Sequence, residues 1–404
     1  MSKMFTARMG RISVSPTLKV LLEAETLRRQ GVDVVDFGAG EPDFPTPDHV
    51  KAAATTAIEE NFTKYTASAG TSELKQAIAA RYESDYGIAV GESEVIVTAG
   101  GKQALYNVAM VLYEKGDEVI THAPCWPTLT EQVRVADATP VIVPTSPEDG
   151  FALHPGEIID AITPRTKAII INSPCNPTGA VISEQHLAEI ADEAARRGIW
   201  VVLDLCYEKL IYDDVAHNLP RVLLDRMRDR TILTGSASKA YSMTGWRCGW
   251  TIAPPDVVSA CNALQSHSTS NVASISQRAA VAALTGSQAP VRAMLDEYRT
   301  RRDSLHAWLS SNPRIECVKP AGAFYLFPRI TKLLSPNGIR TSAEFAQALL
   351  DDARVALTAG EGFEAPGYLR ISYATSLERL REGANRLLTF VEKLEREGRA
   401  VAAS

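Results

Sequence analysis

The chain has 404 residues, of which 45% are hydrophobic and 22% are charged, as in an ordinary globular protein. This length exceeds the roughly 250–300 residues that a single hydrophobic core supports, so we expect two domains. The formal net charge is −6, with acidic and basic residues interspersed along the chain, which argues against a nucleic-acid-binding protein.

The sequence also lacks the patterns of secreted, membrane and metal-binding proteins. Its first ten residues contain no apolar core of a secretory signal, and no apolar run reaches the ~20 residues that span a bilayer. The six cysteines include no Cys-x-x-Cys pair, and the seven histidines no His-Glu-x-x-His spacing. We therefore expect a cytoplasmic enzyme without a structural metal.

Short apolar runs alternate with helical patterns from about residue 95 onward. Such uninterrupted runs are typical of strands covered on both faces, as in a mostly parallel sheet flanked by helices. A helix is expected over 183–197, because Ser183 can cap its start and Gly198 can end it. In chain order, strands are predicted at 94–98, 117–122, 139–144, 167–172, 199–203, 231–233 and 249–252, with another helix at 101–114.

The C-terminal part has a different pattern. A charged helix at 291–310 precedes a strand at 322–325, a helix at 342–350, a strand at 368–372 and a helix at 377–397. We expect a large α/β domain at 49–300 with a seven-stranded sheet, and a smaller α+β domain built from 1–48 and 301–404. Ligands of parallel sheets bind beyond the carboxyl ends of the strands, so candidate site residues should lie there.

Several strand ends carry residues suited to a flat, charged ligand. The first strand leads into Gly101 and Lys102 at a helix N-terminus, which is either an anion site or only a tight connection. Trp126 could stack on a ligand or pack in the core. Asn176 lies in a turn fixed by two prolines and a glycine. Asp204 follows five apolar residues and could cap a helix or hold a cationic ring nitrogen.

The strand at 231–233 leads into a segment that contains Ser236, Lys239 and Arg247. This segment is either a solvated loop with two cations or a Schiff-base lysine beside a phosphate-binding arginine. One cofactor would use all the strand-end groups, because its aldehyde needs a lysine, its ring nitrogen an acid, and its phosphate an arginine, hydroxyls and a helix N-terminus. The combination predicts pyridoxal 5'-phosphate.

These residues lie in strings that resemble the class I/II aminotransferases of fold type I, most closely their bacterial aspartate aminotransferase-like subgroup. The strings are GEPDF at 40–44, KY at 64–65, GGK at 100–102, NSP at 172–174, NPTG at 176–179, SK at 238–239, MTGWR at 243–247, GAFY at 322–325 and RISYA at 370–374. The resemblance runs from about Ser15 to the last helix. Two departures are Cys125, where the family commonly has tyrosine, and DLCY at 204–207, where it often has DExY.

The resemblance implies a role for each candidate. Lys239 would bond to the cofactor aldehyde and later move a proton between the substrate Cα and the cofactor. Asp204 would keep the pyridine nitrogen protonated, and Tyr207 and Asn176 would hydrogen-bond the phenolic oxygen. Trp126 would stack on the ring, and the phosphate would be held by Gly101, Lys102, Ser236, Arg247 and, from a partner subunit, Tyr65.

The resemblance also implies how the substrate binds. Arg370 would take the α-carboxylate in a two-bond fork, helped by the backbone of Gly40. Sites of this family lie at a dimer interface, so a homodimer is implied, with Tyr65 contributed across the interface.

Substrate choice depends on Lys102 and Thr17. In the resembling subgroup this lysine can meet a distal carboxylate and the threonine segment lies over the substrate, so aspartate or glutamate with 2-oxoglutarate or oxaloacetate is expected. Alternatively, Lys102 faces phosphate or solvent. Prephenate or an aromatic amino acid is also compatible, and a lyase such as a C–S lyase is a third alternative. A transcription regulator is disfavoured, because fewer than 50 residues precede the string at 40–44.

Cys125, Cys175 and Cys206 each precede a proposed cofactor contact. We expect them near the carboxyl ends of neighbouring strands, around one site. The favoured interpretation is small, soft packing behind the ring. The alternative is an accessible thiol whose pKa is lowered by the phosphate-binding cations.

Overall fold

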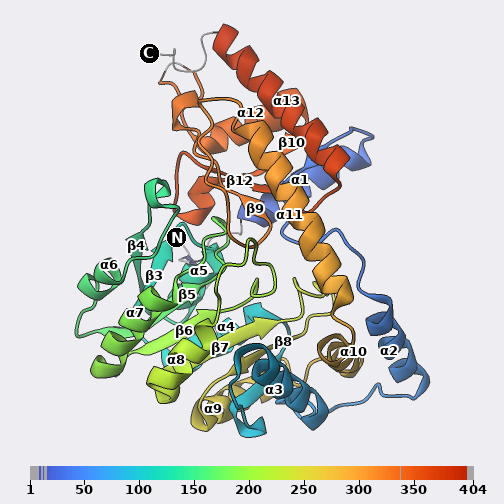
Figure 1. The fold of residues 1–404 in the computed structure, drawn as a ribbon, viewed down its shortest axis with the longest axis vertical. Coiled ribbons are helices and arrows are strands. Elements are labelled where there is room, and N and C mark those ends of the chain that lie inside the picture. The colour runs from blue at the N-terminus through green and yellow to red at the C-terminus, as the bar shows by residue number, and fades with distance from the viewer. Residues whose placement is uncertain (1–8, 11, 13–15, 337, 398–404) are drawn as a thin grey trace, which may run out of the picture.

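Seven strands form the main sheet, in the lower half of the computed structural model, which describes residues 9–10, 12, 16–336 and 338–397 (Figure 1). The order is β2-β8-β7-β6-β5-β3-β4, and β8 alone runs in the direction opposite to the other six strands. The prediction of a mostly parallel seven-stranded sheet is therefore confirmed. The strands are β2 (Val95–Thr98), β3 (Glu118–Ala123), β4 (Thr139–Pro144), β5 (Thr166–Asn172), β6 (Trp200–Asp204), β7 (Thr231–Ser236) and β8 (Gly249–Ile252).

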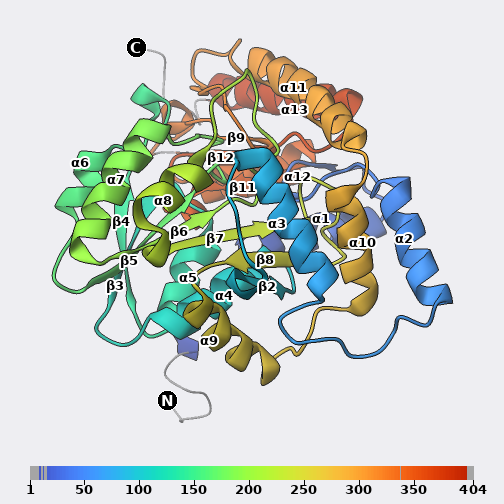
Figure 2. The same cartoon turned by 60° about the horizontal axis from the view of Figure 1, so that its bottom comes forward.

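Helices cover both faces of this sheet (Figure 2). Alternate strand residues enter different cores: Val201 and Leu203 of β6 pack in one cluster, while Val202 packs in the other. The first cluster takes in α3 (Ser72–Tyr86), α6 (Pro155–Asp160), α7 (Glu184–Arg197) and α8 (Leu219–Met227), and the second α4 (Gly101–Leu112), α5 (Pro127–Val135) and α9 (Pro255–Ser266). This two-sided burial explains why the strands are continuously apolar.

The ends of α7 follow its predicted caps. The Ser183 hydroxyl accepts a hydrogen bond from the backbone N–H of His186 at 3.1 Å, and Gly198 ends the helix in the left-handed conformation, with φ 68°. The helix predicted at 183–197 is therefore confirmed.

The N-terminal and C-terminal segments pack together in the upper half of the molecule (Figure 1). The short strand β1 (Val35–Asp36) pairs in parallel with β10 (Val355–Ala356), and β11 (Thr358–Ala359), β12 (Leu369–Ser372) and β9 (Tyr325–Leu326) form an antiparallel sheet. The helices of this half are α1 (Pro16–Arg29), α11 (Ala289–Leu309), α12 (Ser342–Ala353) and α13 (Leu377–Arg396), while α2 (Asp48–Glu59) and α10 (Ser274–Thr285) flank the lower half. The helix α11 runs across residue 300, where we expected the boundary between the domains. The division into domains stays a prediction.

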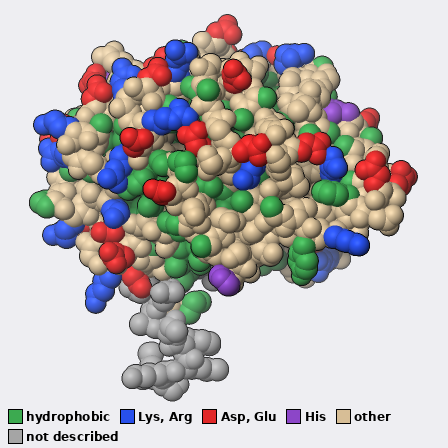
Figure 3. Space-filling view, turned by 90° about the horizontal axis from the view of Figure 1, so that it is seen from below, with side chains coloured by type: hydrophobic (Ala, Val, Ile, Leu, Met, Phe, Trp, Pro, Cys, Tyr) green, Lys and Arg blue, Asp and Glu red, His purple; other side chains and the backbone are tan. Residues whose placement is uncertain are grey.

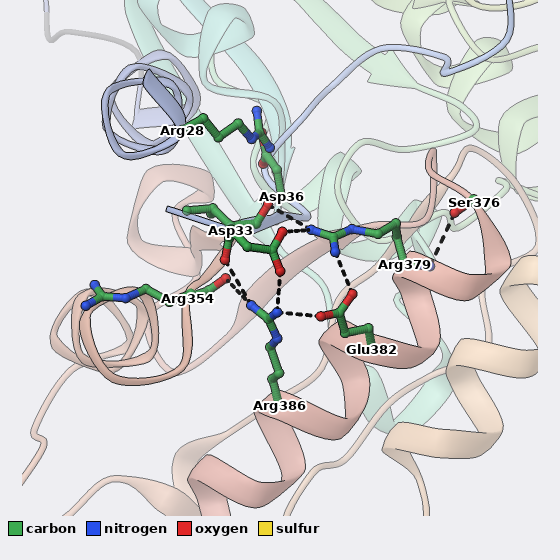
Figure 4. Close-up of polar contacts among 9 residues, drawn as sticks. Arg28, Asp33, Asp36, Arg354, Ser376, Arg379, Glu382 and Arg386 are labelled. Atoms are coloured by element: carbon green, nitrogen blue, oxygen red, sulfur yellow. Dashed lines mark hydrogen bonds and ion pairs between the residues drawn. The ribbon is translucent and has the colours of Figure 1, made fainter. Parts of the chain in front are cut away.

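A charged cluster ties the segment before β1 to α13 (Figure 4). Arg379 and Arg386 of α13 donate to the Asp33 carboxylate at 2.9 and 2.5 Å. Asp36 pairs with Arg28 of α1 at 3.1 Å and accepts a hydrogen bond from the Gly38 N–H at 2.8 Å. These contacts fix the start of the 38–41 segment, which reaches the site described below.

On the face seen from below, acidic and basic side chains are interspersed (Figure 3). This face therefore does not present a patch of one charge that would bind a large, oppositely charged partner. Within the described ranges, no helix combines the length and the apolar character needed to cross a membrane.

Gly383 generates a stability prediction. A Cβ at this position of α13 would come within 2.8 Å of Val35 Cγ1, and closer still to the ring of Phe37. We expect Gly383→Ala to push α13 away from β1 and to destabilise the fold by about 1–3 kcal/mol. Gly156→Ala, in α6 with no atom within 4 Å of the new methyl group, is the control and should leave the thermal midpoint unchanged or slightly higher. Equal midpoints for both variants would contradict the packing argument.

Candidate active site

A cavity of about 520 Å³ lies at the carboxyl ends of β5, β6 and β7. The structure brings together there most of the residues selected from the sequence: Gly40, Gly101, Lys102, Trp126, Asn176, Asp204, Tyr207, Ser236, Lys239, Arg247 and Arg370. It adds residues for which the sequence suggested no role, among them Glu41, Asn172, Thr244 and Tyr325.

Lys239 is held at the centre of the cavity by the turn that follows β7. Its ammonium donates to the Gly40 carbonyl and lies 5.8 Å from the centre of the Phe324 ring. Burial lowers the pKa of Lys239, and the nearby Arg370 and Arg247 lower it further. A lysine whose pKa is lowered is more readily a neutral amine, the form that attacks a carbonyl carbon.

Asp204 ends β6 and is buried. Its carboxylate accepts hydrogen bonds from Asn172 Nδ2 and from the Cys206 N–H, both at 3.1 Å. Burial raises the pKa of Asp204 to about 7, and the nearby Glu208 adds to the rise. Among the described residues no cation pairs with this carboxylate, so a cationic group of a ligand would stabilise its charged form.

Tyr207 and Asn176 lie beside this acid. The Tyr207 hydroxyl is 2.8 Å from the Tyr325 hydroxyl, and burial raises the pKa of Tyr207. The backbone N–H of Asn176 donates to Asn172 Oδ1 at 2.8 Å, and its side-chain Oδ1 accepts a hydrogen bond from Arg370 at 3.2 Å. Both side chains therefore have hydrogen-bonded polar groups at the cavity wall.

Arg370, on β12, is a buried guanidinium without a carboxylate partner in the described part of the chain. It donates to Asn176 Oδ1 at 3.2 Å and to the Gly38 carbonyl at 2.9 Å, and it lies over the Tyr325 ring at 4.4 Å. Its Nε has no hydrogen-bond partner among the residues that the structure describes. A buried cation with a free donor is suited to a bidentate carboxylate.

The N-terminus of α4 forms an anion cradle with Ser236 and Arg247. Arg247 adopts a left-handed backbone conformation, with φ 54°, and donates to the carbonyls of Ala99 and Thr244 at 3.0 Å. Gly100 permits this arrangement, because a Cβ there would lie 2.5 Å from Arg247 Nη2. The helix dipole, a hydroxyl and a guanidinium thus converge where a phosphate could bind.

The rim of the cavity carries Lys102, whose ammonium lies 5.1 Å from the centre of the Trp126 ring. Desolvation lowers the pKa of Lys102, and Arg247 lowers it further. One expected site residue, Tyr65, is 91% exposed and does not line the cavity of its own chain. Thr17 lies in α1, and the expectation for its side chain falls outside the described part of the structure.

The three cysteines follow the carboxyl ends of the adjacent strands β3, β5 and β6, as expected. Only Cys206 lines the cavity, with its sulfur 3.6 Å from the Ser236 hydroxyl. The idea of a lowered thiol pKa is wrong, because burial raises the pKa of Cys125, and raises those of Cys175 and Cys206 to about 11. The described residues also contain no cluster of three or more potential metal ligands.

The charges of the cavity do not balance. Its lining includes four cations and two carboxylates: Lys102, Lys239, Arg247, Arg370, Glu41 and Asp204. None of the six forms an ion pair with another described residue. Of these six groups, Asp204 and Arg370 are buried, and a buried charge without a partner is costly. The cavity therefore favours a ligand that offers a cationic group to Asp204 and negative groups to the surplus of cations.

Asp204 generates a pH prediction for the protein without ligand. Because the pKa of Asp204 is raised from 3.8 to about 7 in the folded state, deprotonation costs more there than in the unfolded chain. Asp204→Asn removes this cost, so the free energy of unfolding of the variant should rise relative to that of the wild type as pH increases from about 4 to about 7. Above about pH 7 the difference between the two proteins should stay constant.

Thermal midpoints of both ligand-free proteins between about pH 5 and pH 8 measure this effect. Asp256→Asn, which changes an exposed carboxyl in α9, is the control. Parallel pH curves for the wild type and Asp204→Asn would contradict the account.

Known proteins place this site in a family. Residues 32–387 match the family Aminotransferase class I and II. The chain is 42% identical to the aspartate aminotransferase of Geobacillus stearothermophilus over 95% of its own length and 98% of the relative's. It is 40% identical to a probable aspartate/prephenate aminotransferase of Aquifex aeolicus, covering 98% and 100%. The structure of Thermus thermophilus aspartate aminotransferase with maleate superposes with a TM-score of 0.91, at 40% identity, over 96% of this chain and all of that one. The chain therefore belongs to the class I and II aminotransferases and is a pyridoxal-phosphate-dependent enzyme.

Proposed function

We propose that the cavity holds pyridoxal phosphate with Lys239 at its aldehyde and Asp204 at its ring nitrogen. The residues fit the cofactor: the unpaired buried carboxylate matches a protonated pyridine, and the cradle of α4, Ser236 and Arg247 matches a phosphate. When bound, the cofactor supplies an electron sink for the bonds at the amino-acid Cα.

The remaining roles concern orientation. Tyr207 and Asn176 would hydrogen-bond the phenolic oxygen, since both present polar groups beside Asp204. Trp126 would stack on the ring, and the backbone amides of Gly101 and Lys102 would contact the phosphate. Lys239, with its lowered pKa, would take the proton from the substrate Cα and then deliver it to the cofactor.

The substrate α-carboxylate would bind Arg370, whose Nε is free to complete a fork, with the Gly40 backbone beside it. One observation carries the choice of side chain. Lys102 presents an unpaired ammonium at the rim, over Trp126, and can meet a second carboxylate. We therefore propose aspartate or glutamate, with 2-oxoglutarate or oxaloacetate as acceptor, in keeping with the names of the relatives.

Prephenate or an aromatic amino acid is the second candidate. The relatives from Aquifex aeolicus and Cereibacter sphaeroides are named as aspartate/prephenate aminotransferases, the second being 41% identical over 95% of this chain. Prephenate also carries a second carboxylate that Lys102 can meet, and Thr17 would lie over either substrate.

The proposal extends to a homodimer. Tyr65 is 91% exposed and lies outside the cavity of its own chain, so its hydroxyl is free to reach the phosphate of a second subunit. We place the enzyme in the cytoplasm, where six unpaired cysteines stay reduced.

Lys102→Ala tests the substrate assignment. Removing the ammonium should lower kcat/KM for aspartate and glutamate by about tenfold or more, and that for alanine and phenylalanine by less than about threefold, because only the first two present a distal carboxylate. The half-reactions are followed by cofactor absorbance over a panel of donors and acceptors that includes prephenate. Lys115→Ala, an exposed lysine beyond the other end of α4, is the control. Equal losses on both substrate types would assign Lys102 to phosphate or structure.

Tyr65 gives a test of the shared site. Tyr65→Ala and Arg247→Ala homodimers should each bind the cofactor weakly. A mixture that exchanges subunits should regain one intact site per hybrid dimer, because one chain supplies Arg247 and the other Tyr65. Cofactor titration of the separate and mixed proteins measures the recovery. A mixture that binds no better than its components would exclude the proposed sharing.

A further inference from the structure

His122 is a buried titratable residue that the proposed function does not use. It lies in β3, next to β5, and the paired residues of these two strands end at Thr121 and Ile170. Beyond that point the backbone N–H of Asn172 donates to His122 Nε2 at 3.4 Å. The imidazole therefore takes the place of a strand carbonyl that the sheet does not provide.

The protonation state of His122 follows from its surroundings. Burial lowers the pKa of His122 to about 4, although a hydrogen bond with the Pro124 backbone opposes the shift. The ring is thus neutral at physiological pH. Because Nε2 accepts from Asn172, the proton is on Nδ1, which fixes a single tautomer.

The side chain of Asn172 in turn contacts Asp204. Its Nδ2 donates to Asp204 Oδ2 at 3.1 Å, while its Oδ1 accepts from the Asn176 N–H at 2.8 Å. If the Asn172 amide were flipped, its oxygen would face the Asp204 carboxylate and its NH₂ group would face the Asn176 N–H. Only one orientation therefore forms both hydrogen bonds. The backbone anchor at His122 and the amide orientation together define where the Asp204 carboxylate points.

We propose that His122 and Asn172 are positioning residues for Asp204: the neutral imidazole holds the Asn172 backbone, and the Asn172 amide holds the carboxylate toward the cofactor. The inference rests on the proposed role of Asp204 at the ring nitrogen. The proposed role differs from that of an ordinary core residue. Loss of core packing at His122 would lower the stability of the fold, but its effect would not depend on Asp204.

The test compares His122→Leu, which removes the acceptor, with His122→Gln, which offers an amide oxygen in its place. Loss of a hydrogen bond that supports a charged group corresponds to about a tenfold effect. We expect His122→Leu to raise the dissociation constant of pyridoxal phosphate, titrated into the apoenzyme, by about tenfold. The kcat of the aspartate half-reaction should fall by about tenfold, with KM changed less than about twofold. His122→Gln should recover most of both losses.

His217→Leu is the matched control. His217 is half-buried and contacts the Ser173 carbonyl at 3.3 Å, one residue along the chain from Asn172. This variant should leave cofactor affinity and kcat within about twofold of the wild type, since no bond to Asn172 is lost. Equal losses in His122→Leu and His217→Leu, or wild-type values in His122→Leu, would overturn the inference.

A double variant separates this inference from the proposed function. In an Asp204→Asn background, His122→Leu should add less than about twofold, because both changes act on one group. Full additivity would overturn the positioning role. If Asp204→Asn itself keeps wild-type affinity and kcat, the proposed function fails, whereas a large loss there with no effect of His122→Leu rejects the inference alone. If His122→Leu does not fold, Asn172→Asp tests the other bond of the proposal: it retains the side-chain volume but removes the amide donor to Asp204 Oδ2. At least a tenfold loss of cofactor affinity is expected, and an unchanged affinity would overturn the proposal.

Discussion

The structure depends on one electrostatic constraint: the cavity buries charges that this chain does not neutralise. Asp204 and Arg370 are buried, and among the described residues Asp204 has no cationic partner and Arg370 no carboxylate partner. The more exposed Arg247 and Lys239 bond only to backbone carbonyls. A buried charge without a partner is costly in an isolated protein, so the rest of the fold must offset that cost. It does so through a sheet buried on both faces, whose parallel strands deliver their carboxyl ends to one edge. The upper half is fixed by the Asp33 cluster (Figure 4). It brings Gly38 and Arg370 to the same place.

Much of this fold could be predicted, because parallel strands covered on both faces are continuously apolar; β4 and β8 have the predicted bounds. The reversed direction of β8 and the order of the strands could not, since both depend on pairing between distant segments. The helix α3 was also not predicted. Its buried face includes Arg81, which pairs with Glu208 at 2.6 Å, so a charged residue interrupts the apolar stripe that marks a helix. That partner lies far along the chain and is invisible in the local pattern.

The candidate site could be predicted where a functional group follows a strand directly, as Asp204 does. Asn172 was missed as a site residue although it ends a predicted strand, because its importance depends on the direction of its amide toward Asp204. Tyr325 reaches Tyr207 from the C-terminal segment, a contact that only the folded chain creates. The thiol prediction failed for a related reason: proximity to cations could be expected, but the burial that raises the pKa of Cys206 could not.

The most direct test of the account is the identity of the residue bonded to the cofactor. Borohydride reduction of the loaded enzyme, followed by proteolysis and mass mapping, fixes the cofactor on the amine to which it is attached. Lys239 and Lys102 are the two lysines that line the cavity, so the experiment has a built-in comparison. The account predicts one labelled peptide, modified at Lys239, and no label in Lys239→Ala. Label at Lys102, or at any lysine outside the cavity, would contradict it.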